Sequence, residues 1–208
     1  MRVPSQTRAI RTRHALLAAA EREFSERGYA ATTAKSIADR AEVATGSFYQ
    51  YFESKDALLR ELASQRLADI SERSLALLES APREASDPFE QARTRMRAVV
   101  GLVMDAHRED PGLHAVLTER RHADRELDAI TSAGERRMVE RISALLERWG
   151  TSGDTLAKAF VLFGMIEGSV HAHVLGEPVV SGTRFVAALV DALLQVALPP
   201  TLRLTRNE

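Results

Sequence analysis

A short segment near the beginning of the chain carries side chains that could read the edges of nucleic-acid bases. Its first residues, where a helix would begin, have small side chains. The residues after them carry hydroxyl and amide groups. These residues are Thr45, Gly46, Ser47, Tyr49, Gln50 and Tyr51. Small residues let a helix approach a groove closely, and hydroxyl and amide groups exchange hydrogen bonds with base edges and phosphates. The composition therefore favours contact between this segment and DNA.

Three predicted helices would position the segment. They cover residues 7–27, 34–41 and 44–51. The first ends at Gly28, because glycine tolerates the left-handed conformation that often follows a helix. Apolar side chains would pin the two short helices together, namely Ile37, Val43, Phe48 and Phe52. Three helices joined by tight turns, with a short and polar third helix, are typical of a helix-turn-helix.

The remainder of the chain also shows helical periodicity, and no segment alternates as a strand would. Further helices are expected over residues 54–80, 89–108, 124–149, 154–175 and 183–198, and a break at Pro111 and Gly112 is expected to precede a short helix through Leu117. The sequence therefore predicts an all-α fold. We expect an N-terminal helix-turn-helix headpiece over residues 1–53 and a C-terminal helical body over residues 54–208.

Composition is consistent with an ordinary globular chain. Hydrophobic residues make up 45% and charged residues 27% of the 208 residues, which excludes a disordered or membrane-spanning class. The overall charge is −1, but residues 1–60 carry ten Lys and Arg against seven Asp and Glu. The chain has no cysteine and no recognisable targeting segment, so we expect a cytoplasmic protein with no membrane partner.

The stretch from Thr32 to Leu59 resembles the DNA-binding signature of the tetracycline-repressor (TetR) family of bacterial regulators. The shared landmarks are Gly28-Tyr29, Thr32-Thr33, Ile37-Ala38, Gly46, the Phe-Tyr-x-Tyr-Phe run over 48–52 and Ser54-Lys55-Asp56. The resemblance covers about the first sixty residues. It implies phosphate contacts from Thr33, Tyr49, Tyr51 and Lys55, and base-edge contacts from Thr45, Gly46, Ser47 and Gln50. Core packing of the two tyrosines and simple exposure of Lys55 are the structural alternatives.

Two residues depart from the family pattern. Glu42 stands where the family usually has glycine, so we expect either a left-handed glutamate at a cost of about 1 kcal/mol or a different turn. Ala44 stands where the family usually has serine. The predicted third helix therefore lacks a capping hydroxyl unless Thr45 replaces it. Both departures bear on the pose of this helix.

The resemblance implies a transcriptional regulator, commonly a repressor, that a small-molecule inducer releases from its operator. A two-fold symmetric protein would bind a palindromic operator. The last two predicted helices carry more apolar surface than one chain can cover, and Phe160, Gly164, Gly168 and Ala172 recur every four residues. We therefore expect a homodimer formed through these helices. A helix-turn-helix regulator without a ligand, and a helical enzyme, remain the alternatives.

The body offers candidate residues for an apolar or amphipathic ligand. They are Met96, Val100, Met104, His107, Met138, Trp149, Phe163 and Glu167. Glu167 lies in the most apolar stretch of the chain, where a carboxylate needs a cation, water or a proton. Its partner would be a polar or cationic group of the ligand, or an arginine such as Arg184.

No catalytic motif or cofactor fingerprint occurs, so we expect no enzymatic activity and no cofactor. The six histidines are poorly spaced for a metal. His171 and His173, for example, are two residues apart on one predicted helix and would point in different directions. We therefore expect no metal site.

Overall fold

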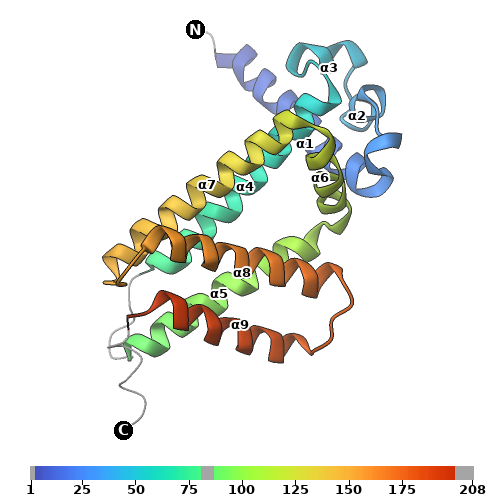
Figure 1. Cartoon of the computed structure of the whole chain (residues 1–208). Helices are drawn as coiled ribbons and strands as arrows, with labels where there is room; N and C mark the ends of the chain where they lie inside the picture. The colour runs from blue at the N-terminus through green and yellow to red at the C-terminus, as the bar shows by residue number, and fades with distance from the viewer. Residues whose placement is uncertain (1–2, 81–86, 200–208) are drawn as a thin grey trace. The chain divides into compact units, whose positions relative to one another are not determined.

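The computed structural model describes residues 3–80 and 87–199. These residues form helices joined by turns, and none of them is assigned to a strand, so the all-α prediction is confirmed (Figure 1). The helices are α1 (Val3–Ala31), α2 (Ala34–Arg40), α3 (Thr45–Tyr51), α4 (Lys55–Glu79), α5 (Pro88–Glu109), α6 (Pro111–Ala123), α7 (Arg125–Arg148), α8 (Thr155–Leu175) and α9 (Gly182–Ala197). No described helix combines the length and apolar character that a membrane crossing requires.

The described helices belong to two compact units. The first contains the chain up to Leu67 together with Asp110–Ser132, and the second contains Ala68–Glu109 together with the chain from Ala133 onward. Helices α4 and α7 therefore contribute to both units. The boundary expected after residue 53 falls inside the first unit.

The first unit has its own apolar core, built from α1, α2, α3, α6 and the beginning of α4 and α7. Its largest fully buried side chains are Phe24, Phe48, Leu16, Ile37, Leu58, Leu59, Leu113 and Leu127. Helix α1 breaks where the sequence predicted, because Gly28 has a φ of 72°, and one further turn continues to Ala31. Helix α2 packs on α1 and on α3. This core therefore fixes the three helices of the headpiece.

Helix α6 is longer than the sequence indicated. Pro111 begins the helix instead of breaking it, since proline fits the first helical position, where no N–H is needed. Asp110 caps this end by accepting from the Leu113 N–H at 2.7 Å, and the Ser25 hydroxyl of α1 donates to the same carboxyl at 2.6 Å. A side chain at Gly112 would lie 2.3 Å from the Ser25 carbonyl oxygen. Glycine at this position therefore permits the close approach of α6 to α1.

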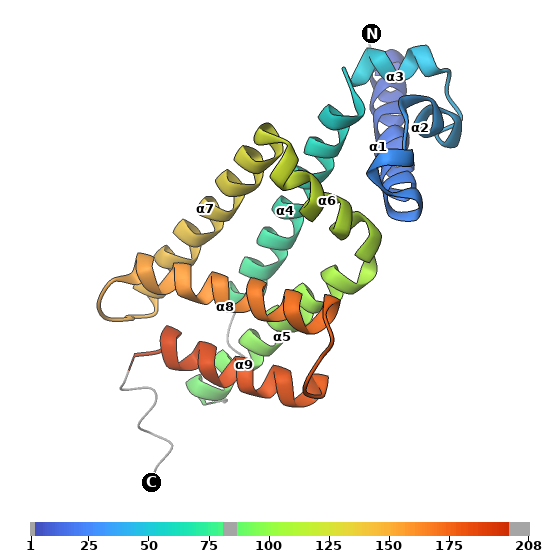
Figure 2. The same ribbon diagram turned by 45° about the vertical axis from the view of Figure 1, so that its right-hand side comes forward.

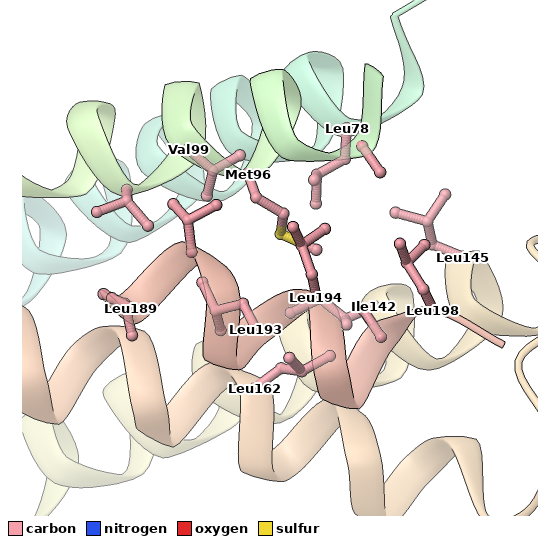
Figure 3. Close-up of a cluster of buried hydrophobic side chains, with 14 of the residues drawn as sticks. Leu78, Met96, Val99, Ile142, Leu145, Leu162, Leu189, Leu193, Leu194 and Leu198 are labelled. Atoms are coloured by element: carbon pink, nitrogen blue, oxygen red, sulfur yellow. The ribbon is translucent and has the colours of Figure 1, made fainter. Parts of the chain in front are cut away.

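The second unit is built around α5, α8 and α9, which pack on one another (Figure 2). Leucines of α9 interdigitate with Met96 and Val99 of α5 and with Leu162 of α8 (Figure 3). The buried residues of α9 are Leu189, Val190, Leu193, Leu194 and Ala197. Burying each large apolar side chain contributes about 1.5–3 kcal/mol, so this core supplies much of the stability of the unit.

Candidate nucleic-acid interface and ligand region

Helix α2 begins with a reciprocal capping arrangement. The Ser36 N–H donates to the Thr33 hydroxyl oxygen at 3.0 Å, and the Thr33 N–H donates to the Ser36 hydroxyl oxygen at the same distance. Such a capping box satisfies backbone donors that a helix leaves unpaired at its beginning. Thr33 is nevertheless exposed. Its predicted phosphate contact remains a prediction.

The turn between α2 and α3 contains a left-handed glutamate, which is the first of the two outcomes that the sequence left open at this position. Glu42 has a φ of 56°, and among the described residues it is the one non-glycine residue with a positive φ. The Val43 N–H donates to the Ala38 carbonyl at 3.0 Å and closes the turn. The second expectation about this region is also confirmed, because Ala44 is the N-cap of α3 and no side chain caps this helix. Thr45 does not replace the missing cap.

One side of helix α3 is buried in the core of the first unit, and the opposite side is exposed. Phe48 is fully buried in the core of the first unit, where its ring lies 5.9 Å from the ring of Phe52. Gly46, Tyr49 and Gln50 are exposed, and the exposed fraction of Tyr49 is 59%. Core packing therefore does not account for Tyr49. The structure thus gives α3 the exposed polar surface that base reading requires.

The other predicted contact residues of α3 are half-buried, namely Thr45, Ser47 and Tyr51. The Tyr51 ring packs against the apolar core, so the alternative that Tyr51 is a packing residue is correct for its ring. A tyrosine ring can pack while its hydroxyl stays available to water or phosphate. The DNA contacts of Thr45, Ser47 and Tyr51 stay predictions.

Lys55 is not a simple exposed lysine. Its ammonium donates to the carbonyl oxygens of Tyr29 and Thr32, each at 2.8 Å, and lies 4.0 Å from the centre of the Tyr29 ring. Burial lowers the pKa of this ammonium, with a smaller opposing effect from the carboxylate of Asp56. Two of its three N–H groups therefore bind backbone carbonyls, and its phosphate contact stays a prediction.

Tyr29 is the centre of a network that the sequence analysis missed. The guanidinium of Arg120 lies 4.0 Å from the Tyr29 ring centre, and the Tyr29 hydroxyl donates to Asp56. Burial, followed by this hydrogen bond, raises the pKa of Tyr29 to about 12. The Gly28-Tyr29 landmark pointed to Tyr29 itself. Nothing in the sequence pointed to Arg120, which comes from α6.

Exposed arginines add positive charge near the beginning of α1. Arg8 and Arg11 are exposed, whereas Arg13 pairs with Glu61 and lies over the ring of Phe52. Arg2 belongs to the same positive stretch of sequence but lies outside the described residues. The positive charge expected for the headpiece is therefore carried in part by accessible guanidinium groups, which attract phosphates.

Six of the predicted ligand residues share the core of the second unit. Met96, Val100 and Met104 of α5 are buried in it, and Met138, Trp149 and Phe163 pack against it. His107 is also buried, and its ring nitrogen Nδ1 lies 2.8 Å from the Val103 carbonyl oxygen. The structure thus gathers these side chains on the inner faces of α5, α7 and α8. Their contact with a ligand remains a prediction.

Glu167 is half-buried on α8, and its surroundings differ from those expected. Burial raises the pKa of its carboxyl, the charge of Glu135 raises it further, and His171 lowers it. Arg184 is not among the charges that act on this carboxyl, so the expected arginine partner is wrong. Glu167 lies on the same helix face as His171, because the two residues are four apart on α8, whereas Arg184 comes from α9.

One face of α8 is apolar and exposed in the described structure. Phe160 is 69% exposed and Val161 48% exposed, and Gly164, Gly168 and Ala172 continue the same face. A side chain placed at Gly164 or Gly168 would meet nothing within 4 Å. The four-residue spacing noted in the sequence therefore marks a surface that residues 3–80 and 87–199 leave uncovered.

A helix-turn-helix unit joined to a second, all-helical unit defines a class of bacterial regulator, and two family models match the chain. Residues 16–62 match bacterial regulatory proteins of the tetR family, and residues 93–195 match the tetracyclin repressor-like C-terminal domain. The chain belongs to the TetR family.

Relatives agree with this assignment. The chain is 34% identical to the transcriptional regulator HbdR of Aromatoleum over 62% of its own length and 55% of that protein. It is 36% identical to a probable acrEF/envCD operon repressor of Escherichia coli K12 over 47% of its length and 42% of that protein. The matched regions thus span about half the length of these relatives.

Solved structures show the same fold. A putative TetR-family regulator from Mesorhizobium loti superposes with a TM-score of 0.72, at 21% identity, over 91% of this chain and 98% of that one. FadR from Bacillus subtilis, solved with stearoyl-CoA, gives a TM-score of 0.68 at 20% identity over 88% and 98% of the two chains. The SmeT–triclosan complex gives 0.70 at 21% identity over 92% and 93%.

The left-handed Glu42 leads to a stability prediction. Replacing Glu42 with glycine should raise the free energy of unfolding by up to about 1 kcal/mol, because glycine adopts a positive φ without the clash of a Cβ atom. Urea denaturation of the full chain measures the change. Glu53→Gly, at a nearby position without a positive φ, is the control and should not stabilise. A loss of stability in Glu42→Gly would show that the side chain makes a contact that outweighs the strain.

Proposed function

We propose that this chain is a DNA-binding transcriptional regulator that reads an operator with α3. The observation that carries the proposal is the division of α3 between a buried anchor, Phe48, and an exposed polar surface at Gly46, Tyr49 and Gln50. Base edges would be read by Thr45, Gly46, Ser47 and Gln50. Phosphates would be held by Thr33, Tyr49, Tyr51 and Lys55. Residues 1–53 then form the reading headpiece, which acts on DNA in the cytoplasm.

The regulator acts as a homodimer in this proposal. The exposed apolar face of α8 supports it, because Phe160 and Val161 would be transferred from water to an interface. The open glycines Gly164 and Gly168 would let a second helix approach closely. Two identical headpieces related by a two-fold axis would then match a palindromic operator.

Repression with release by a small molecule is the regulatory mode that we propose. The core of the second unit supports it, since methionines such as Met96, Met104 and Met138 can repack around an apolar guest. Ligands named with structural neighbours, triclosan for SmeT and stearoyl-CoA for FadR, are largely apolar or amphipathic. An inducer of the same character, with its polar group toward Glu167, would have to bind one dimer arrangement better than the other. No enzymatic role is part of this proposal, and the relatives that match are regulators.

The DNA-reading role predicts different effects for two substitutions. Gln50→Ala should change the preference at one base pair of each half-site by about 1–3 kcal/mol, because an amide reads one base edge. Lys55→Ala should weaken binding to all sequences and reduce the salt slope by about one phosphate contact. Fluorescence anisotropy at several salt concentrations measures both effects.

Lys158→Ala is the matched control, since Lys158 belongs to the second unit. Thermal unfolding of each variant accompanies the binding data, because Lys55 also ties two backbone carbonyls. If Lys55→Ala weakened binding with an unchanged salt slope, its role would be structural and the phosphate contact would be wrong.

The dimer surface predicts the effect of filling an open glycine. Gly168→Leu should yield monomers at micromolar concentration, because the leucine finds free space in the single chain but would block a partner helix. Sedimentation equilibrium measures the mass, and Gly101→Leu on α5 serves as the control at an equally open helical glycine. A native chain that sediments as a monomer would overturn the proposal.

The inducer site is tested by the same DNA-binding assay. Glu167→Gln should shift the concentration of an inducer that releases half of the bound DNA, since the amide carries no charge. An unchanged release curve for a compound that releases the native chain would exclude Glu167 from recognition.

A further inference from the structure

Helices α5 and α8 of the second unit bring together two histidines that are far apart in the sequence. The rings of His107 and His171 stand at 89° to each other with centroids 6.2 Å apart. A ring nitrogen of one lies within 4.8 Å of a ring nitrogen of the other. Because the two histidines come from different helices, their contact does not follow from the spacing of histidines along the chain.

The ring of His107 is fixed in an orientation that suits a ligand. Its Nδ1 lies 2.8 Å from the Val103 carbonyl oxygen, and a carbonyl only accepts, so Nδ1 carries the proton and donates. In the neutral ring the lone pair is therefore on Nε2. Metal-bound histidines usually donate their other ring nitrogen in this way, which fixes both tautomer and orientation. The side chain is 5% exposed, so packing restrains it further.

The second histidine is accessible from outside the unit. His171 is exposed on α8, and Glu167 precedes it by four residues, so the two side chains lie on the same helix face. The charge of His171 acts on the Glu167 carboxyl, and so does that of Glu135 on α7. The site thus combines one buried imidazole, one exposed imidazole and a carboxylate on the same helix face as the exposed imidazole, with the charge of Glu135 also acting on that carboxylate.

We propose that His107, His171 and Glu167 form a binding site for a divalent transition-metal cation such as Zn²⁺. Two imidazoles and one carboxylate, with water in the fourth position, are a set that zinc accepts in tetrahedral geometry. With metal–nitrogen bonds of about 2.0–2.1 Å, two tetrahedral ligand nitrogens lie about 3.3 Å apart. The ring nitrogens already lie within 4.8 Å of each other, and His171 is exposed, so the proposal requires a shift of its side chain toward His107. Imidazole ligands disfavour Mg²⁺ and Ca²⁺, which prefer oxygen.

The proposal does not depend on DNA binding, and of its three ligands only His107 and Glu167 are also predicted to contact an organic ligand, whereas His171 belongs to the metal site alone. An edge-to-face aromatic pair of His107 and His171 without metal affinity is the competing interpretation. Metal binding can be measured on the protein alone. If the protein bound no metal, the proposal that it binds an operator would still stand. If it bound no operator, its metal binding could still be measured.

The experiment is a titration of the untagged full-length chain with Co²⁺ as a spectroscopic probe, followed by competition with Zn²⁺. We expect one equivalent of Co²⁺ to bind with the visible absorption of a four-coordinate ion. His171→Ala should weaken binding at least about 100-fold, since loss of a direct ligand exceeds the 10–100-fold effect of an outer partner. Glu167→Gln should weaken Co²⁺ binding at least about 10-fold, which is the lower end of the effect of removing an outer partner of a ligand.

Two further variants make the result decisive. His122→Ala, which removes an exposed histidine of the first unit, is the matched control and should bind as the native chain does. His107→Gln tests the buried ligand, with circular dichroism to check folding. Because His171 is exposed, we expect His171→Ala to fold. The test therefore stays valid even if His107→Gln unfolds. Absence of saturable Co²⁺ binding, or equal binding by His171→Ala and the native chain, would overturn the proposal.

Discussion

Burial of Phe48 is the constraint on which the candidate interface depends. Helix α3 has seven residues and no side-chain cap, and a helix this short is not stable alone in water. Its pose therefore comes from tertiary packing, through the fully buried ring of Phe48 and its contact with Phe52. Because one face is held in the core, the opposite face must be exposed. Sequence, packing and the proposed reading of DNA are thus linked by a single side chain.

A second group of contacts determines where the end of the headpiece lies relative to α4 and α6. Lys55 binds the backbone carbonyls at the end of α1, and Arg120 of α6 covers the Tyr29 ring. Arg60 of α4 pairs with Asp124, which follows α6, and this hydrogen bond holds the pKa of Asp124 below its ordinary value. The first unit therefore includes α6 as well as the three helices of the headpiece. A change in α6 would act directly on the residues next to α3.

Local features of the fold could be predicted from sequence because their causes are local. The end of the first helix at Gly28, the left-handed Glu42 and the uncapped α3 each follow from one or two neighbouring residues. The helical extent after Pro111 was underestimated, since the cap by Asp110 and the contact with Ser25 determine where α6 begins. Arg120 on Tyr29, and His107 beside His171, could not be predicted. These contacts join residues far apart in the chain, and only the packing of helices brings them together.

Footprinting of the DNA that flanks the gene for this chain tests the central claim most directly. A dimer that reads with two copies of α3 should protect two half-sites related by two-fold symmetry, with centres separated by about 10 base pairs or a multiple of that spacing. Protection should disappear at high salt, because phosphate contacts release counterions. Protection without symmetry, or equal affinity for unrelated DNA at physiological salt, would contradict the account.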